Sequence, residues 1–288
     1  AVEANTRAFQ LGRLAAHDAA GLERLLGGEA DAAAFGSIDE PLPQLVARLS
    51  AALVDYQDGQ VAERMRRLVE RVAAVERPLR APGEPLSLAA TVARSYAKLL
   101  MVKDEYEVAR LHASPRLRAA IDAQFEGDYT LTVLLAPPLL ARRGPDGLPR
   151  KMRFGGWVFP VFRVLAALRG LRGTPLDPFG YTLERRAERA LPDDYAATVA
   201  AMLRPSGAAP LQAAERLALV EQIAGLPASI RGFGHVKLRN LAEAKRREAG
   251  LLARLGLAPI VSEPVRRALE QAGPEAAAAA VADGGLSG

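Results

Sequence analysis

Apolar residues recur every three or four positions along most of this chain, the spacing that places them on one face of a helix. The clearest run steps by 4, 4, 3, 3 and 4 residues through Leu88, Val92, Tyr96, Leu99, Val102 and Tyr106. It predicts one long helix that ends near Leu111. Ser87 lies at its start and is a residue type that caps helix N-termini.

Shorter runs of the same period predict further helices. Ser114-Pro115 has the pattern of an N-cap followed by a first helical residue, and Thr182 can cap a helix over 184–189. A separate helix is expected to begin with Asp193 and to include Met202. The remaining predicted helices lie near 1–16, 45–53, 60–77, 158–165, 217–224 and 241–255, and the last of these is the final helix expected.

One segment has a period of two instead, which is typical of a half-buried strand. Its apolar face carries Tyr129, Leu131, Val133 and Leu135. Residues 151–154 are the expected partner strand, after a turn at 144–147. These elements predict an α+β fold that is predominantly α-helical, with one β-hairpin or small antiparallel sheet. We expect this mostly helical domain over 31–275 and a tail over 276–288.

Composition excludes several kinds of site. The 288 residues include no cysteine, so this chain has no disulfide and no cysteine-ligated zinc or iron–sulfur centre. Its three histidines, His17, His112 and His235, lie far apart, and we expect no histidine-rich metal centre. No stretch has the length and apolarity of a secretory signal or a membrane span, so a cytoplasmic location is expected.

The net charge of +5 does not by itself indicate a nucleic-acid partner. Five of the 38 basic residues are lysine and the other 33 are arginine, but 33 acidic residues are interspersed with them. Nucleic-acid-binding proteins more often concentrate basic charge on one face or in one tail. We therefore expect solvated, mutually compensating charges and no binding to nucleic acid.

Two charged segments could carry chemistry. The run KDEYEVAR at 103–110 offers Asp104, Glu105 and Glu107 as a general acid and base, although neighbouring cations favour a salt-bridge network. The run RGFGHVKLRN at 231–240 places Arg231, His235 and Lys237 beside two glycines at the start of a helix. Cationic side chains and exposed backbone N–H groups at a helix start are what a phosphate site requires. The alternative is an ordinary loop-to-helix turn, in which the glycines adopt backbone angles that other residues avoid.

Two further features carry no assigned chemistry. The loop at 171–181 contains Arg172 and, between two prolines, Asp177, and loops of this kind often support interfaces or sites. Trp157, which follows two glycines, is expected to be a packing anchor rather than a binding platform.

Four ordered motifs resemble a known family. They are KLLMVKDEYEVARL (98–111), LAPPLLARRGPDGLPRKMRFGGW (135–157), LRGTPLDPFGYTLERRAER (171–189) and IRGFGHVKLRN (230–240). Together they resemble the C-terminal region of fused bacterial indolepyruvate ferredoxin oxidoreductases, which are thiamine-diphosphate enzymes acting on 2-oxo acids. The opening residues 3–18 look like the last helix of that family's γ-type, Rossmann-like domain. The resemblance therefore implies that residues 1–30 are the end of that domain and a linker, and that the chain is a fragment.

The resemblance implies an activity for the parent enzyme and none for this segment alone. Family members oxidatively decarboxylate aryl pyruvates to aryl-acetyl-CoA and reduce ferredoxin. Thiamine diphosphate, Mg²⁺ and an iron–sulfur cluster are implied for the parent, and none of them for this segment. The expected partners are the thiamine-binding and γ-type domains, with ferredoxin for the complete, homo-oligomeric enzyme.

Three hypotheses follow for this chain. The first is a non-catalytic structural or interface part, with Arg231, His235 and Lys237 near the phosphates of CoA if it touches a ligand. The second is a free-standing helical binding or scaffold protein that binds RNA, which the basic pI favours. The third, ranked last, is an independent enzyme that uses the carboxylates at 104–107.

Overall fold

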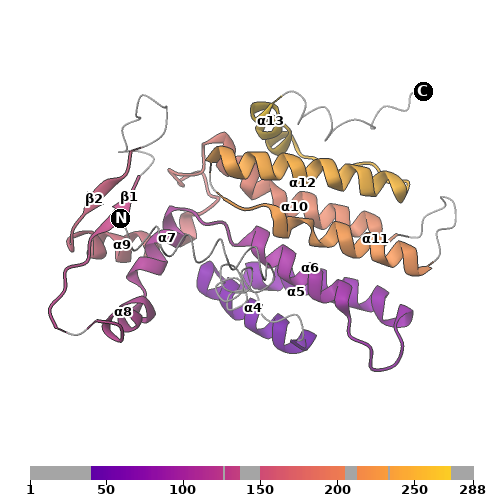
Figure 1. Ribbon diagram of the computed structural model, residues 1–288, viewed down its shortest axis with the longest axis horizontal. Helices are drawn as coiled ribbons and strands as arrows, with labels where there is room; N and C mark the ends of the chain where they lie inside the picture. Colours follow the sequence, from indigo (N-terminus) through magenta and orange to yellow (C-terminus); the bar gives the residue numbers. More distant parts are fainter. Residues whose placement is uncertain (1–39, 126, 137–149, 205–212, 233, 274–288) are drawn as a thin grey trace, which may run out of the picture.

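The protein folds as a helical bundle with a smaller lobe beside it (Figure 1). The computed structural model describes residues 40–125, 127–136, 150–204, 213–232 and 234–273. Over these residues it contains ten α-helices and one two-stranded antiparallel sheet, which confirms the predominantly helical α+β fold. The expected helix at 1–16, the linker up to residue 30 and the tail at 276–288 lie outside the described residues.

The bundle is built from two stretches of chain, one before and one after the small lobe in the sequence. The first supplies α4 (Leu42–Tyr56), α5 (Gly59–Glu76) and α6 (Ser87–Leu100). The second supplies α10 (Leu183–Met202), α11 (Ala213–Gly225), α12 (Gly234–Arg254) and α13 (Glu263–Ala272). Their apolar faces share one hydrophobic core, in which α6 contacts α4, α5, α10 and α11.

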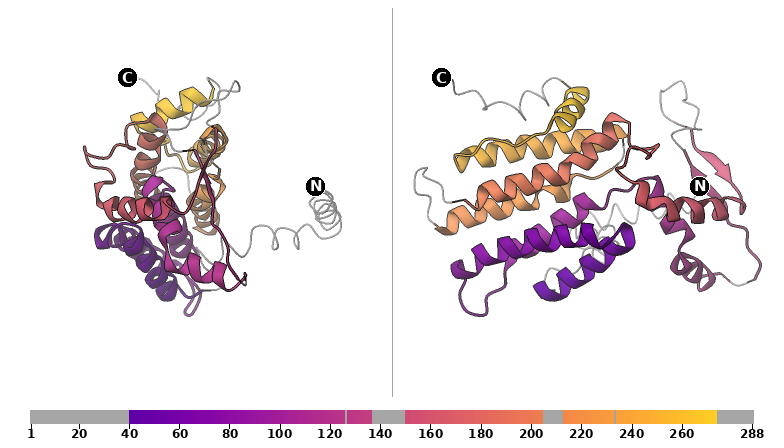
Figure 2. Two further views of the ribbon diagram at one scale, coloured as in Figure 1. Left: turned by 90° about the vertical axis from the view of Figure 1, so that its left-hand side faces the viewer. Right: turned by 180° about the vertical axis from the view of Figure 1, so that it is seen from behind.

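The small lobe lies between α6 and α10 in the chain and at one end of the bundle in space (Figure 2). It contains α7 (Glu105–Ala113), α8 (Pro115–Asp122), β1 (Val133–Leu135), β2 (Met152–Phe154) and α9 (Val158–Ala167). In the hairpin, Val133 pairs with Phe154 and both are buried, while Leu134 points to solvent, as the period of two predicts. This lobe has its own small core of Ala109, Val133, Phe154, Val158 and Phe162.

The predicted long helix over 87–111 is wrong, because the structure breaks it into α6 and α7. Asp104 begins the second helix by accepting a hydrogen bond from the backbone N–H of Glu107, at 2.9 Å. Ser87 is not the cap of α6 either. The wholly buried carboxylate of Glu76 on α5 accepts from the N–H groups of Leu88 and Ala89, at 3.0 and 2.8 Å.

Two boundaries in the second half of the bundle also differ from expectation. The two helices expected before and after residue 193 are the single helix α10, which continues through Pro192. Leu191, Tyr195 and Val199 are all buried in the bundle core, and this packing outweighs the lost backbone hydrogen bond. The helix α13 follows the one expected to be last, and its buried residues Val265, Ala268 and Leu269 pack on α10 and α12.

The predicted caps of the other helices are confirmed. Ser114 Oγ accepts from the N–H of Arg116 at the start of α8, and Thr182 Oγ1 accepts from that of Arg185 at the start of α10. Among the described residues, no helix combines the length and the apolar character that crossing a membrane requires.

Candidate functional site

A buried ion pair joins the two lobes. Arg172, in the loop after α9, donates from Nε to Asp104 Oδ2 at 2.6 Å and from Nη2 to Asp104 Oδ1 at 3.0 Å. It also donates from Nη1 to the carbonyl of Tyr56 at 3.0 Å, and its guanidinium lies 3.8 Å from the centre of the Tyr56 ring. Asp104 is 2% exposed and Arg172 is 9% exposed. The fork of one arginine thus holds the end of α4 and the start of α7 together.

A second buried carboxylate, Asp177, organises the same loop. It accepts from the backbone N–H groups of Gly173 and Phe179, from the hydroxyl of Tyr106 at 3.2 Å, and from Arg189 of α10. Burial alone would raise the pKa of Asp177, but these hydrogen bonds outweigh burial and hold the pKa below its ordinary value. Every oxygen of both carboxylates is satisfied, so Asp104 and Asp177 stabilise the fold, in line with the salt-bridge network favoured for 103–110.

The structure places two of the predicted site residues, Arg231 and Lys237, on one cavity of about 390 Å³. It lies between the end of α6, the start of α10 and the residues before and at the start of α12. Its lining carries five cationic side chains and two carboxylates: Lys98, Lys103, Arg185, Arg231, Lys237, Glu184 and Glu188. His235 is the second residue of α12, and its side chain lies outside the described part of the structure.

Carboxylates of α10 contact the groups that an anion would need in this cavity. Glu184 Oε1 accepts from the backbone N–H of Gly234 at 3.1 Å, and Lys237 forms an ion pair with Glu188. The two glycines, Gly232 and Gly234, have φ of 97° and 54°, a backbone conformation that residues with a side chain rarely adopt. The glycines therefore have a backbone role here, and the phosphate of CoA stays a prediction for this cavity.

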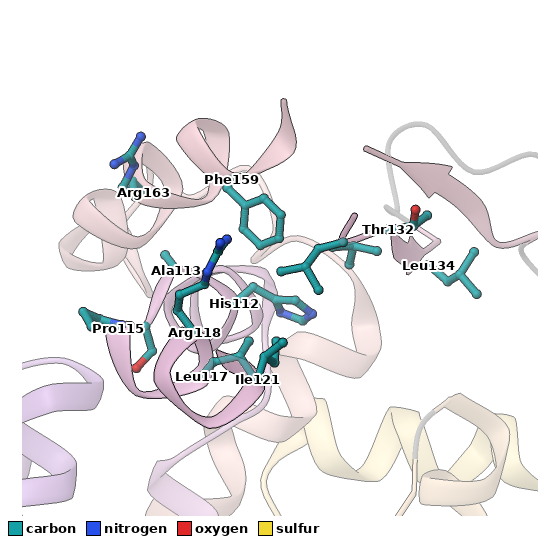
Figure 3. Close-up of a pocket in the computed structure, with 13 residues that line it drawn as sticks. His112, Ala113, Pro115, Leu117, Arg118, Ile121, Thr132, Leu134, Phe159 and Arg163 are labelled. Carbon is teal, nitrogen blue, oxygen red and sulfur yellow. The ribbon is translucent and has the colours of Figure 1, made fainter. Parts of the chain in front are cut away.

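A larger hollow of about 550 Å³ lies within the small lobe, between α7, α8, β1 and α9 (Figure 3). Phe159, His112 and Arg118 converge on it from α9, α7 and α8. Its other apolar walls are Leu117, Ile121, Leu131, Val133 and Leu134. His112 Nδ1 is 2.7 Å from the carbonyl of Val108, and since a carbonyl only accepts, Nδ1 carries the proton.

An arginine-lined hollow of about 620 Å³ adjoins it and shares Ala113, Ser114, Pro115 and Arg163. It adds Arg110, Arg116 and Arg169 to Arg163, against the single carboxylate of Asp55. Arg110 forms an ion pair with Glu107 at 2.7 Å, and Arg169 donates to the carbonyl of Gln57 at 3.4 Å. Within the described ranges, the guanidinium groups of Arg116 and Arg163 have no hydrogen bond or ion pair.

Sequence reasoning missed this arginine group, because its members come from α7, α8, α9 and the turn after α9. Along the chain each of them looks like one more interspersed charge. In the described part of the chain, no three His, Asp or Glu side chains are grouped as a metal site would require.

One helix face is apolar and exposed. Trp157, Val161, Val164 and Leu168 follow one another at steps of 4, 3 and 4, from the residue before α9 to the residue after it, and are 65%, 51%, 63% and 44% exposed. An adjacent face places Val158 and Phe162 in the lobe core. The expectation that Trp157 is a packing anchor is wrong, since Trp157 is mostly exposed; its ring centre lies 5.8 Å from that of Phe154 in an edge-to-face contact.

Comparison with known proteins gives one match. The chain matches the model of a family of unknown function, DUF6537, over residues 42–250. The match begins at α4, includes the small lobe and extends into the last turns of α12. No curated protein and no solved structure matches the chain.

Proposed function

We propose that this chain, which belongs to the DUF6537 family of unknown function, is the non-catalytic interface part of an indolepyruvate ferredoxin oxidoreductase. The complete enzyme would convert an aryl pyruvate and CoA to an aryl-acetyl-CoA and carbon dioxide, with the two electrons passing to ferredoxin. Thiamine diphosphate, Mg²⁺ and the iron–sulfur cluster would belong to its other domains, which are the partners of this chain.

The exposed apolar face of α9 is the observation that carries the interface role. The apolar face of a helix is normally buried, whereas α9 has a second apolar face that lies outside the core. Exposed apolar side chains that form a contiguous stripe mark interaction surfaces. Another domain that covered Trp157, Val161, Val164 and Leu168 would remove these apolar side chains from water.

The motifs that carry the family resemblance support a structural role for this chain. Their side chains contact one another: Asp104 with Arg172 and Glu105 with Arg185 at the junction of the two lobes, and Glu188 with Lys237 within the bundle. A motif whose charged residues form internal ion pairs is explained by folding and needs no catalytic role.

The test uses the native polypeptide that carries this sequence, purified from its source cell or expressed at full length. We expect a mass several times 30.6 kDa and ferredoxin reduction that depends on an aryl pyruvate and CoA. Val164→Asp should disrupt assembly and lower this activity, because a carboxylate would have to be buried in the interface. Val75→Asp is the matched control, since Val75 is 41% exposed on the bundle.

Two results would contradict the proposal. The first is a full-length protein without this activity, and the second is equal assembly of the Val164→Asp and Val75→Asp variants. A native mass near 30.6 kDa with salt-sensitive RNA binding would favour the free-standing scaffold instead.

A further inference from the structure

We propose that the adjoining hollows of the small lobe form a binding site for an organic anion with an apolar body. The apolar body would occupy the hollow of Figure 3, and the carboxylate or phosphate would meet Arg163 at its border. This site goes beyond the interface role, because it needs no other domain to supply a residue.

The apolar hollow has the size and lining of a small-molecule pocket. Its volume of about 550 Å³ lies in the range of about 300–1,000 Å³ that such pockets occupy. Phe159, Leu117 and Ile121 line it from two different helices, so a planar or branched apolar group contacts a wall on each side. His112, Ser114 and Thr132 add polar groups that can orient a bound molecule. Arg118 also lines this hollow, but its charge is compensated by an ion pair with Asp122 at 3.3 Å.

The second hollow is cationic beyond what the fold requires. Of its four arginines, Arg110 is compensated by Glu107 and Arg169 contacts a backbone carbonyl, while Arg116 and Arg163 have no ion pair within the described ranges and the hollow's one carboxylate is that of Asp55. A bound anion would bring opposite charge to these guanidinium groups. The planar guanidinium fork matches the two oxygens of a carboxylate or a phosphate.

Arg163 connects the two halves, because it lines both hollows. A molecule whose charged group lies at Arg163 and Arg116 therefore has its apolar body directed toward Phe159. Neither a small inorganic anion nor a neutral apolar molecule would use both halves. This predicts a preference for molecules that combine the two properties.

The experiment is photoaffinity labelling of the full-length protein with a 3-arylpropionate that carries a diazirine, followed by peptide mapping. We expect labelled peptides from α8 and α9, and competition by 3-phenylpropionate or phenyl phosphate. Which of these two competes better tells whether the site prefers a carboxylate or a phosphate. Inorganic phosphate and 3-phenylpropanol should compete at least tenfold more weakly.

Two variants test the residues. Arg163→Gln should weaken the competing acids about tenfold or more, and Phe159→Ala should weaken them without changing the binding of inorganic phosphate. Arg153→Gln is the control, because Arg153 is an exposed arginine of β2 that lines neither hollow. Labelling elsewhere, equal affinity of the Arg163→Gln and Arg153→Gln variants, or equal competition by 3-phenylpropanol would overturn the proposal.

The labelling experiment is independent of the interface test, which measures assembly of the Val164→Asp variant. Arg163→Gln removes a charge from an exposed side chain of the same helix and leaves the stripe of Trp157, Val161, Val164 and Leu168 intact. A native protein that assembles normally but fails to be labelled would refute the anion site alone.

Discussion

Replacing Arg172 by alanine should loosen the small lobe from the bundle. The substitution removes a two-point ion pair to Asp104, a hydrogen bond to the carbonyl of Tyr56 and the stacking on the Tyr56 ring. It also leaves the carboxylate of Asp104, which is 2% exposed, without its counter-charge.

The expected loss in the free energy of unfolding follows from the burial of Asp104. Removing one partner of a buried ion pair costs about 3–5 kcal/mol, since the other charge stays in a poorly solvated place. For a chain of this size, about 4 kcal/mol corresponds to a fall of about 8–16 °C in Tm. Arg172→Lys should lie between the alanine variant and the wild type, because an ammonium keeps the charge but loses the planar fork.

The assay is urea unfolding, combined with hydrogen exchange resolved by segment. The amides of α7 and α9 should lose more protection than those of α12 and α13, which the ion pair does not contact. In the Asp104→Asn background, Arg172→Ala should lower the free energy of unfolding by less than in the wild type, because no buried carboxylate is left without a counter-charge.

The control is Arg153→Ala, which should change the free energy of unfolding by less than about 0.5 kcal/mol, as exposed positions do. A loss below about 1 kcal/mol for Arg172→Ala, or uniform exchange across both lobes, would refute the reasoning that this ion pair clamps the lobes.

Two further predictions concern buried carboxylates. Glu76→Gln should destabilise the protein by about 3 kcal/mol, because an amide NH₂ would face one of the N–H donors of α6 and the charge opposite Arg80 would be lost. Glu70→Gln, at an exposed position of the same helix, should be neutral in the same urea titration, and equal losses for the two variants would contradict this account. The folded-state pKa of Asp177 lies below its ordinary value of 3.8, so its ionised form contributes stability above that value, and this stability is lost as pH falls through the folded-state pKa. The urea midpoint should therefore fall between about pH 5 and pH 3, and less steeply for Asp177→Asn, whereas an identical slope would sink the assignment.

Much of the helical architecture could be predicted from the sequence, because periodicity and capping act locally. Ser114 and Thr182 cap the helices that follow them, as their types and neighbours indicate. The break between α6 and α7 could not be predicted from periodicity, since Tyr106 continues the pattern of the preceding helix and is itself buried. It depends on Asp104, whose ion pair with Arg172 comes from a distant loop. A local pattern contains no information about such a partner.

The candidate sites were less predictable for the same reason. Lys237 and Arg231 were identified because they are close in sequence, but the carboxylates of α10 that contact this segment lie about 50 positions earlier. Arg163 of α9 and Arg116 of α8 line one hollow because α7, which adjoins α8 in the chain, packs on α9. The unexpected exposure of Trp157 had a different origin: an aromatic residue is placed in a core by default, and only the folded lobe shows that the core side of α9 is already occupied.

The ion pair between Asp104 and Arg172 also affects how many residues the small lobe can contain. Its two residues are 68 positions apart, and they stand at the entry and the exit of the small lobe. The bundle helices α6 and α10, on either side, contact each other directly. The lobe is thus an insertion whose ends are fastened together, and each doubling of the intervening length costs only about 0.6 kcal/mol of closure entropy. Related chains can therefore lengthen, shorten or exchange the segment between these two residues while the bundle keeps its shape.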